Sequence, residues 1–273
     1  MLLTILIHLL LSSPFAFGQK VDARMLPGHS LRLLYDGKSL TEARLSLIDG
    51  AVNTIYLATF ELNRDSSSLE IAKHLCDKAH EGVDVRLLLD GRGSRHFKRH
   101  VKQLRDCGAR VLFYHPLDWG LAEFRRVLHE KLLAVDGKVA ILGGSNYANS
   151  YDEAGPESTH WHDLDVRIAG PAACWFHYRF EREWKRVAWM DIRPERRWYS
   201  GELLERIIGR RYGLQSFRSC EFVDGGGQAR VYPIQQDPYF DPGNWLLHTH
   251  LRLINASRHR IRLYAPYFTP HEK

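Results

Sequence analysis

The chain has 273 residues, of which 44% are hydrophobic and 26% are charged, and these are ordinary values for a globular protein. They exclude a disordered or collagen-like chain and leave room for one large domain or two modest ones. Lysine and arginine outnumber aspartate and glutamate by 38 to 32. The resulting net charge of +6 favours anionic partners such as phosphates, nucleic acid or acidic lipid headgroups, without choosing among them.

Residues 1–18 form an apolar segment that we expect to be a signal peptide or a membrane anchor. Apart from two polar residues, positions 2–11 are apolar, and Ala16-Phe17-Gly18 places small residues where a signal is cut. However, no Lys or Arg precedes the run, and it is shorter than the about 20 residues of a spanning helix. A cleaved signal, an uncleaved anchor and an interfacial helix or misassigned start therefore all stay open.

Strands and helices alternate from about residue 43. Strands are predicted over residues 54–60, 83–89 and 110–114, where β-branched and aromatic or other apolar residues dominate. Helices are predicted over residues 69–79, capped by the serines at 66–68, and over 97–107, because apolar residues recur three and four apart. This alternation predicts an α/β fold with a mixed, mainly parallel sheet and helices on both faces.

A hairpin and a long helix are predicted further along. Two apolar runs, 127–135 and 138–142, are separated only by Asp136-Gly137, which is typical of a type I′ turn. Residues 171–189 carry an aromatic stripe at helical spacing, which indicates a core-facing helix and no chemistry. The arginine-rich stretch 191–211 is interpreted as a solvated bridge, with phosphate binding as the alternative.

The four cysteines are Cys76, Cys107, Cys174 and Cys220, and none has the C-x-x-C spacing of a zinc or redox site. We therefore expect no structural metal. Cys76 and Cys107 each fall on the apolar side of a predicted helix, so they are expected to be small core residues. The cysteine count does not decide whether the compartment is oxidising.

Residues 45–57 match residues 251–263 without a gap, at an offset of 206. Leu45, Leu47, Ile48, Ile55 and Leu57 all meet an identical residue in the second copy. In each copy an amphipathic helix turns into an apolar strand, which predicts an internal duplication. We accordingly expect a first lobe over residues 30–190, a linker over 191–227 and the start of a second lobe over 228–273.

The densest chemical signal combines His129, Lys131, Asp136 and the run Gly143-Gly144-Ser145-Asn146. On a strand, positions i and i+2 share a face, so His129 and Lys131 should act together, while Asp136 should serve the turn. Neutral imidazole is a plausible nucleophile towards phosphorus, and a nearby ammonium stabilises the charge that develops on phosphate oxygens. The Ser145 hydroxyl and the Asn146 amide are candidate phosphate-binding donors.

The pattern His129-x-Lys131-x4-Asp136, followed by Gly143-Gly144-x-Asn146, resembles the HKD motif of the phospholipase D superfamily. Several further segments resemble bacterial cardiolipin synthases of that superfamily: Glu61, Asp90-Gly-Arg-Gly-Ser94, Asn146-Tyr147, Gly155-Pro-Glu157, Asp163, Val166-Arg-Ile-Ala-Gly-Pro171 and Ala265-Pro-Tyr-Phe-Thr-Pro270.

This resemblance implies two similar α/β lobes that each give one H-x-K motif to a shared site, with no metal and no other cofactor. One histidine attacks phosphorus, and the other protonates the leaving alcohol and then activates the acceptor. His129 would be the first-lobe histidine, Lys131 the phosphate-binding lysine and Asn146 the motif asparagine, and the family counts Asp136 in the motif as well. No second H-x-K-x4-D occurs in the sequence, and His271-Glu272-Lys273 is interpreted as a coincidence. We therefore expect an incomplete chain that lacks the second HKD lobe.

The expected function is a phosphatidyltransferase of the cardiolipin synthase type, acting through a phosphohistidine at a bacterial cell membrane or envelope. Its expected partners are an anionic phospholipid substrate and the membrane surface, which suit the positive charges clustered between residues 92 and 105. A solvated helix face explains that cluster equally well. A phospholipase D-like hydrolase or nuclease is the first alternative, although nucleic acid is not the expected partner because no nucleic-acid module is recognisable. An inactive remnant that only binds lipid or phosphate is the second alternative.

Overall fold

The computed structural model describes residues 26–114, 127–153, 160–191, 225–233 and 245–262. The chain divides into one compact unit that ends at Pro233 and a second unit from Ile234 onward, and each is described by itself. The predicted segment 1–18 lies outside the described residues, as does nearly all of the arginine-rich stretch 191–211.

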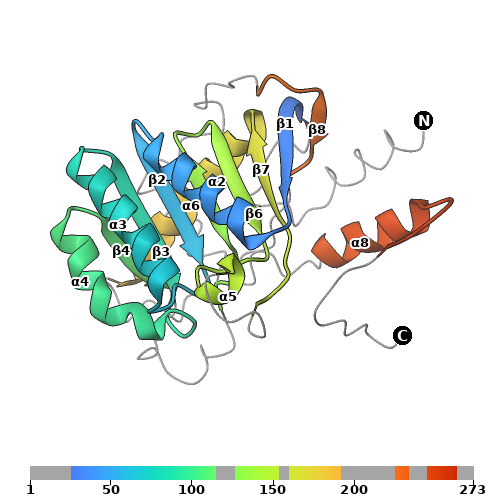
Figure 1. Ribbon diagram of the computed structural model, residues 1–273. Helices are drawn as coiled ribbons and strands as arrows, with labels where there is room; N and C mark the ends of the chain where they lie inside the picture. Colours follow the sequence, from blue (N-terminus) through green and yellow to red (C-terminus); the bar gives the residue numbers. More distant parts are fainter. Residues whose placement is uncertain (1–25, 115–126, 154–159, 192–224, 234–244, 263–273) are drawn as a thin grey trace. The chain divides into compact units, whose positions relative to one another are not determined.

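The first unit is built on one eight-stranded sheet with the strand order β4-β3-β2-β5-β6-β7-β1-β8 (Figure 1). The strands are β1 (Leu26–Leu34), β2 (Thr54–Thr59), β3 (Asp84–Asp90), β4 (Arg110–Tyr114), β5 (Leu132–Val135), β6 (Val139–Gly143), β7 (Asp165–Ala169) and β8 (Ala229–Val231). The helices of this unit are α2 (Gly37–Asp49), α3 (Ser66–His80), α4 (Lys98–Asp106), α5 (Asn149–Asp152) and α6 (Pro171–Asp191), with a 3-10 turn η1 (Arg95–Phe97) before α4.

The α/β class, the mixed sheet and the helices on both faces are confirmed, whereas the expectation of a mainly parallel sheet is wrong. Only β2 with β3 and β3 with β4 pair in parallel. The other five pairings, from β2·β5 to β1·β8, are antiparallel. Parallel neighbours need a crossover, and α3 and α4 supply the two crossovers from β2 to β4. Strands β5 and β6 are joined by a tight turn, which permits only antiparallel pairing.

The two faces of the sheet are covered by different helices. Helices α2, α3 and α4 lie on one face and α6 lies on the other (Figure 1). Ile55 and Leu57 of β2 belong to the core cluster on the first face, and both are fully buried. Tyr56 between them stacks on His177 and Phe180 of α6, with ring centroids 4.3 and 4.8 Å apart. Successive side chains of β2 point to opposite faces of the sheet, so this strand contributes to the core on both faces.

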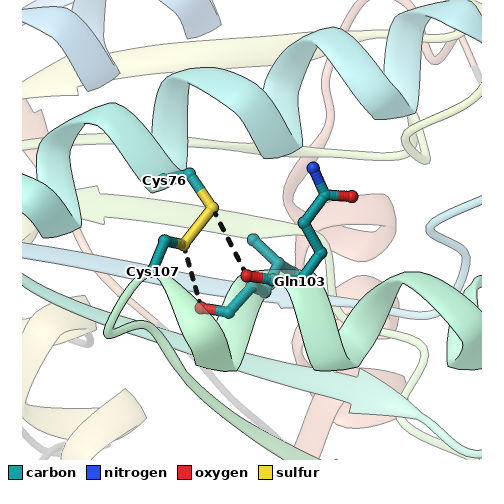
Figure 2. The surroundings of a disulfide bond; sticks show 4 residues. Cys76, Gln103 and Cys107 are labelled. Carbon is teal, nitrogen blue, oxygen red and sulfur yellow. Dashed lines mark hydrogen bonds between the residues drawn. A yellow bond between two sulfur atoms is a disulfide. The ribbon is translucent and has the colours of Figure 1, made fainter.

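A disulfide joins Cys76 of α3 to Cys107, the residue that caps α4 (Figure 2). Cys107 belongs to the core cluster and Cys76 packs against it, so the expected core placement is confirmed, but the bond between them was not predicted. The Cα atoms are 5.4 Å apart, within the usual range for a disulfide. Helical periodicity placed each cysteine on the inner side of its helix, but it could not show that α3 and α4 are neighbours on one face. Cys174 is disulfide-bonded as well. These bonds indicate an oxidising compartment.

The second unit contains helix α8 (Trp245–Ala256). The offset of 206 carries the range of α2, residues 37–49, to residues 243–255, so α8 lies where the repeat places a helix. Residues 257–262 form no strand, and the remainder of the strand expected there lies outside the described residues. Within the part of the chain that the structure describes, no helix has both the length and the apolar character needed to cross a bilayer.

Candidate active site

The hairpin of β5 and β6 carries Asp136 in its turn, as predicted. Asp136 and Gly137 have φ values of 53° and 64°, and Lys138 N donates to Val135 O at 3.0 Å. Positive φ at both central residues is what a type I′ turn requires. The Asp136 carboxylate accepts hydrogen bonds from the backbone N–H groups of residues 52, 53 and 54 at 3.0, 2.8 and 2.7 Å. It therefore ties the start of β2 to the hairpin.

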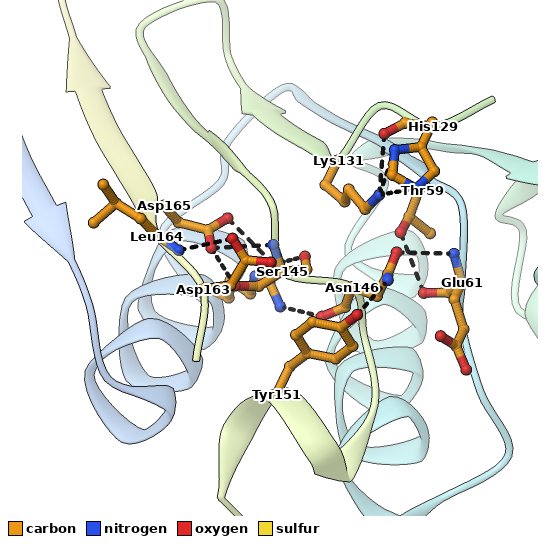
Figure 3. Close-up of polar contacts among 11 residues, drawn as sticks. Thr59, Glu61, His129, Lys131, Ser145, Asn146, Tyr151, Asp163, Leu164 and Asp165 are labelled. Atoms are coloured by element: carbon orange, nitrogen blue, oxygen red, sulfur yellow. Dashed lines mark hydrogen bonds and ion pairs between the residues drawn. The ribbon is translucent and has the colours of Figure 1, made fainter. Parts of the chain in front are cut away.

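His129 and Lys131 lie next to each other, although not on a strand. Strand β5 begins at Leu132 and not at residue 127, so both residues belong to the extended segment that leads into it. Lys131 Nζ lies 3.3 Å from each ring nitrogen of His129 and donates to the His129 carbonyl oxygen at 3.0 Å (Figure 3). The predicted pairing of these two side chains is confirmed, and its basis is this direct contact.

The electrostatics keep the imidazole neutral. His129 is exposed on one side, and partial desolvation lowers its pKa. The Lys131 ammonium lowers this pKa further, and the Asp163 carboxylate opposes the shift. Burial also lowers the pKa of Lys131 to about 8, against the opposing charges of nearby carboxylates that include Asp163 and Asp165. Near neutral pH the site therefore presents an unprotonated imidazole beside an ammonium group that is still largely charged.

Asp90 and Phe60 hold the segment that carries His129. Asp90, at the end of β3, accepts from Leu128 N at 2.8 Å through one carboxylate oxygen. Its other oxygen accepts from Arg92 N and Gly93 N at 2.9 and 2.8 Å. Burial raises the pKa of Asp90, and these backbone bonds oppose the rise. The Phe60 ring lies 5.2 Å from the His129 ring, so His129 is fixed from two sides.

The loop after β6 brings Ser145 and Asn146 to the same region (Figure 3). Ser145 is buried, and its hydroxyl donates to the Asp165 carboxylate in a short hydrogen bond. The Asn146 amide donates to the Tyr151 hydroxyl at 2.9 Å, and its oxygen accepts from Glu61 N at 3.2 Å. Since a hydroxyl has one proton, Ser145 can donate to phosphate only by giving up its bond to Asp165. Asn146 keeps a second N–H.

The two glycines of this loop allow a close backbone approach to the segment before β7. A Cβ atom on Gly143 would lie 2.4 Å from the Leu164 carbonyl oxygen, and one on Gly144 would lie 1.9 Å from the Asp163 carboxylate. Backbone atoms therefore leave no room for a side chain at Gly143, whereas a side chain at Gly144 would require Asp163 to move. The effect of the two glycines is to bring Asp163 and Asp165 towards His129 and Lys131.

Arg44 of α2 is the main site residue that sequence reasoning missed. It is 4% exposed and donates to the carbonyl oxygens of Asn146 at 2.9 Å and Ser145 at 2.7 Å. Its guanidinium lies 3.7 Å from the Asp165 carboxylate and 4.0 Å from the centre of the Tyr147 ring. A signal existed, because Leu40, Arg44 and Ile48 recur at intervals of four along the buried side of α2.

The site combines the neutral imidazole of His129, the buried ammonium of Lys131 and the amide of Asn146. These are the groups that nucleophilic attack on a phosphate ester requires. Within the described ranges, no group of three or more histidine, cysteine, aspartate or glutamate residues could hold a metal ion.

Comparison with known proteins gives the family. The profile of the family described as "Cardiolipin synthase, PLD-like domain" matches residues 45–184. The chain therefore belongs to this phospholipase D-like family. Similar curated proteins include a cardiolipin synthase of Clostridium perfringens (strain 13 / Type A), 26% identical over 89% of this chain and 48% of that protein. Another is cardiolipin synthase A of Pseudomonas entomophila, 27% identical over 90% of this chain and 47% of that protein. The chain thus spans about half the length of the curated relatives it matches.

Solved structures give weaker similarities. NucT from Helicobacter pylori is 13% identical, and the match covers 56% of this chain and 94% of that chain with a TM-score of 0.46. The phospholipase D family member Nuc from Salmonella typhimurium is 20% identical, and the match covers 57% of this chain and 94% of that chain with a TM-score of 0.43.

Proposed function

We propose that this chain carries the first lobe of a phosphatidyltransferase of the cardiolipin synthase type. Residues 30–190 form that lobe in this proposal, 191–227 the linker and 228–273 the start of a second lobe, with 1–18 a signal peptide or membrane anchor. The observation that carries the function is the neutral His129 imidazole in contact with the buried Lys131 ammonium. The cardiolipin synthase relatives, which match almost the whole chain, support the substrate class.

The proposed reaction has two halves, with His129 as the nucleophile. Its ring nitrogen attacks the phosphorus of an anionic phospholipid such as phosphatidylglycerol, and the bond from phosphorus to the oxygen of the headgroup glycerol breaks, which leaves the phosphatidyl group on His129. The leaving oxygen takes a proton from a second acid, which the resemblance assigns to the histidine of a second lobe. In the second half, a lipid alcohol gives its proton to that group and attacks phosphorus. The bond from phosphorus to His129 then breaks, which frees the nucleophile.

The other site residues either bind the phosphate or hold the backbone segments that surround it. The Lys131 ammonium stabilises the charge on the phosphate oxygens, and the second N–H of Asn146 adds a donor to them. The Ser145 hydroxyl would also donate to a phosphate oxygen if it gave up its hydrogen bond to Asp165. Asp136 contributes through the hairpin, because its carboxylate is occupied by three backbone N–H groups. The partner surface in this proposal is a bacterial membrane or envelope, on a side where disulfides form.

Offering the purified protein two substrates tests the proposal. Phosphatidylglycerol labelled in the phosphatidyl group and single-stranded DNA are incubated separately with wild type and with His129→Ala. We expect acid-labile label on the peptide that contains His129 only for wild type and only with lipid, and labelled cardiolipin only when a protein that carries the second lobe is added. Cleavage of DNA without a lipid product would favour the nuclease instead. Neither label on His129 nor cleavage of DNA, with lipid still bound, would indicate a binding remnant and overturn the proposal.

A further inference from the structure

Helix α4 and the turn before it present their basic side chains to solvent. The apolar residues of this segment, Phe97, Val101 and Leu104, are 0%, 4% and 1% exposed and pack into the core. Its cations lie on the opposite side and are all exposed. The α4 basic surface is defined here as Arg92, Arg95, Lys98, Arg99, Lys102 and Arg105.

Most of the net charge of the protein is concentrated on this surface. Residues 92–106 contain six basic side chains and one acidic one, Asp106, so they carry a charge of +5. The whole chain carries +6. Asp106 pairs with Lys102 at 2.6 Å and can neutralise only one of the six cations. A concentrated charge of one sign is not needed for solubility, because a mixed surface supplies that equally well.

The neighbouring helix α3 gives an internal comparison. Residues 66–81 contain Lys73 and Lys78 against Glu70, Asp77 and Glu81, a charge of −1. Both lysines form ion pairs along their own helix, Lys73 with Asp77 at 3.8 Å and Lys78 with Glu81 at 2.5 Å. Helices α3 and α4 cover the same face of the sheet, so exposure to solvent alone does not account for the difference between them.

The α4 basic surface adjoins the candidate active site. The Asp90 carboxylate bonds both to Arg92 N and to the N–H of Leu128, next to His129. The Ser94 hydroxyl donates to the Phe60 carbonyl oxygen and accepts from Leu62 N, both at 3.0 Å. The segment 91–94 is therefore fastened both to the strand end that carries Phe60 and to the segment that carries His129.

The opposite end of α4 is fixed as well. The disulfide from Cys76 to Cys107 holds the end of α4 against α3 (Figure 2). Arg105 donates to the Val111 carbonyl oxygen at 2.8 Å, and Lys98 Nζ lies 5.4 Å from the centre of the Phe113 ring. A surface held at both ends keeps a fixed position relative to His129.

We propose that the α4 basic surface docks on the anionic headgroups of a phospholipid membrane and so holds the site at the lipid plane. This inference rests on the proposed function, because a site for phospholipids must work where their phosphates lie. Basic side chains near an anionic leaflet add attraction roughly in proportion to their number, and salt screens that attraction. Removing three of the six cations should weaken vesicle binding on the order of 100-fold.

Co-sedimentation of the full chain with two kinds of vesicle tests the docking. One kind is phosphatidylcholine with about one third phosphatidylglycerol, and the other is pure phosphatidylcholine. The test variant is Lys98→Gln/Arg99→Gln/Lys102→Gln. The matched control, Arg32→Gln/Lys38→Gln/Lys73→Gln, removes the same charge from exposed positions elsewhere. We expect salt-sensitive binding to the anionic vesicles that the test variant loses and the control keeps.

Three results would overturn the docking. Equal weakening by both variants would show that only net charge matters. Binding to pure phosphatidylcholine that neither variant changes would place the membrane contact elsewhere. Preference for single-stranded DNA over vesicles, lost in the test variant, would make this a nucleic-acid surface. The proposed function is tested separately by the label on His129. Docking without that label would contradict the proposed function alone, and label on His129 without charge-dependent docking would contradict only this inference.

Discussion

Replacing both Cys76 and Cys107 with alanine should lower the free energy of unfolding by about 3 to 4 kcal/mol. The disulfide closes a loop with a sequence separation of 31 residues. The chain-entropy relation for a loop of that length gives roughly 12 cal/mol/K, or about 3.7 kcal/mol at 25 °C. The loss arises in the unfolded chain, which regains the freedom that the cross-link removes. Helices α3 and α4 should still form and pack, because the sheet and the apolar face of α4 do not depend on the bond.

Urea unfolding followed by far-ultraviolet circular dichroism measures this difference, with wild type and the double variant compared under the same non-reducing conditions. The disulfide of Cys174 stays intact in both proteins, so the difference isolates the Cys76–Cys107 bond. Alkylation under denaturing conditions, followed by mass spectrometry, should find neither thiol free in wild type. A difference below about 1 kcal/mol, with the bond verified in wild type, would refute the loop-entropy reasoning. Two free thiols in protein isolated from its own compartment would refute the assignment to an oxidising environment.

Four further outcomes are expected. In an enzyme complete with a second lobe, His129→Ala should lower transfer by several orders of magnitude at an unchanged melting temperature, and transfer within tenfold of wild type would contradict a nucleophilic role. Asp136→Asn should keep more transfer than Lys131→Ala, since asparagine tolerates the turn; equal and complete loss at unchanged stability would indicate a chemical role for Asp136. The pH profile should fall on the acid side as His129 takes up a proton, below the usual histidine pKa, and above about pH 8 as Lys131 loses its proton. Lys131→Arg should move the alkaline fall upward, and an unmoved fall would exclude Lys131 as its source. Arg44→Met should lower the free energy of unfolding by about 3 to 5 kcal/mol in urea titrations, because it leaves the buried Asp165 carboxylate without its cation, and Arg44→Lys should cost less.

The elements of the fold followed from the sequence because they depend on near neighbours. The predicted strand 110–114 matches β4, and the helix predicted over 171–189 lies within α6. Helix α3 begins at Ser66, so the serines expected to cap it lie within it, and its N-cap is Asp65, whose carboxylate accepts from Ser68 N at 3.1 Å. The Ser68 hydroxyl instead donates to the Tyr147 carbonyl oxygen at 2.6 Å. The hydrogen-bond partner of Ser68 therefore depended on Tyr147, which lies in a loop far away in the sequence.

The direction of strand pairing was not a local property. Helical crossovers predicted a parallel sheet correctly from β2 to β4. The β5–β6 hairpin is local, and its antiparallel pairing followed from the turn sequence. The pairing of β2 with β5, and of β1 with β7 and β8, joins segments that are distant in the sequence. Hydrophobic periodicity shows which face of a strand is buried but not which strand lies beside it.

The residues of the candidate site likewise fall into a group that is close together in the sequence and a group that only the fold brings together. His129, Lys131 and Asp136 lie within eight positions of one another, so their spacing alone identified them and separated the turn residue from the other two. Arg44, Asp90 and Asp165 come from three distant elements and hold the segments around His129 through hydrogen bonds and an ion pair. The disulfide likewise needs two helices to be neighbours. The sequence by itself identified the candidate reacting groups, because residues at a short spacing can be recognised in the chain. Tertiary structure alone decided what holds them, because those contacts exist only after the sheet has brought the segments together.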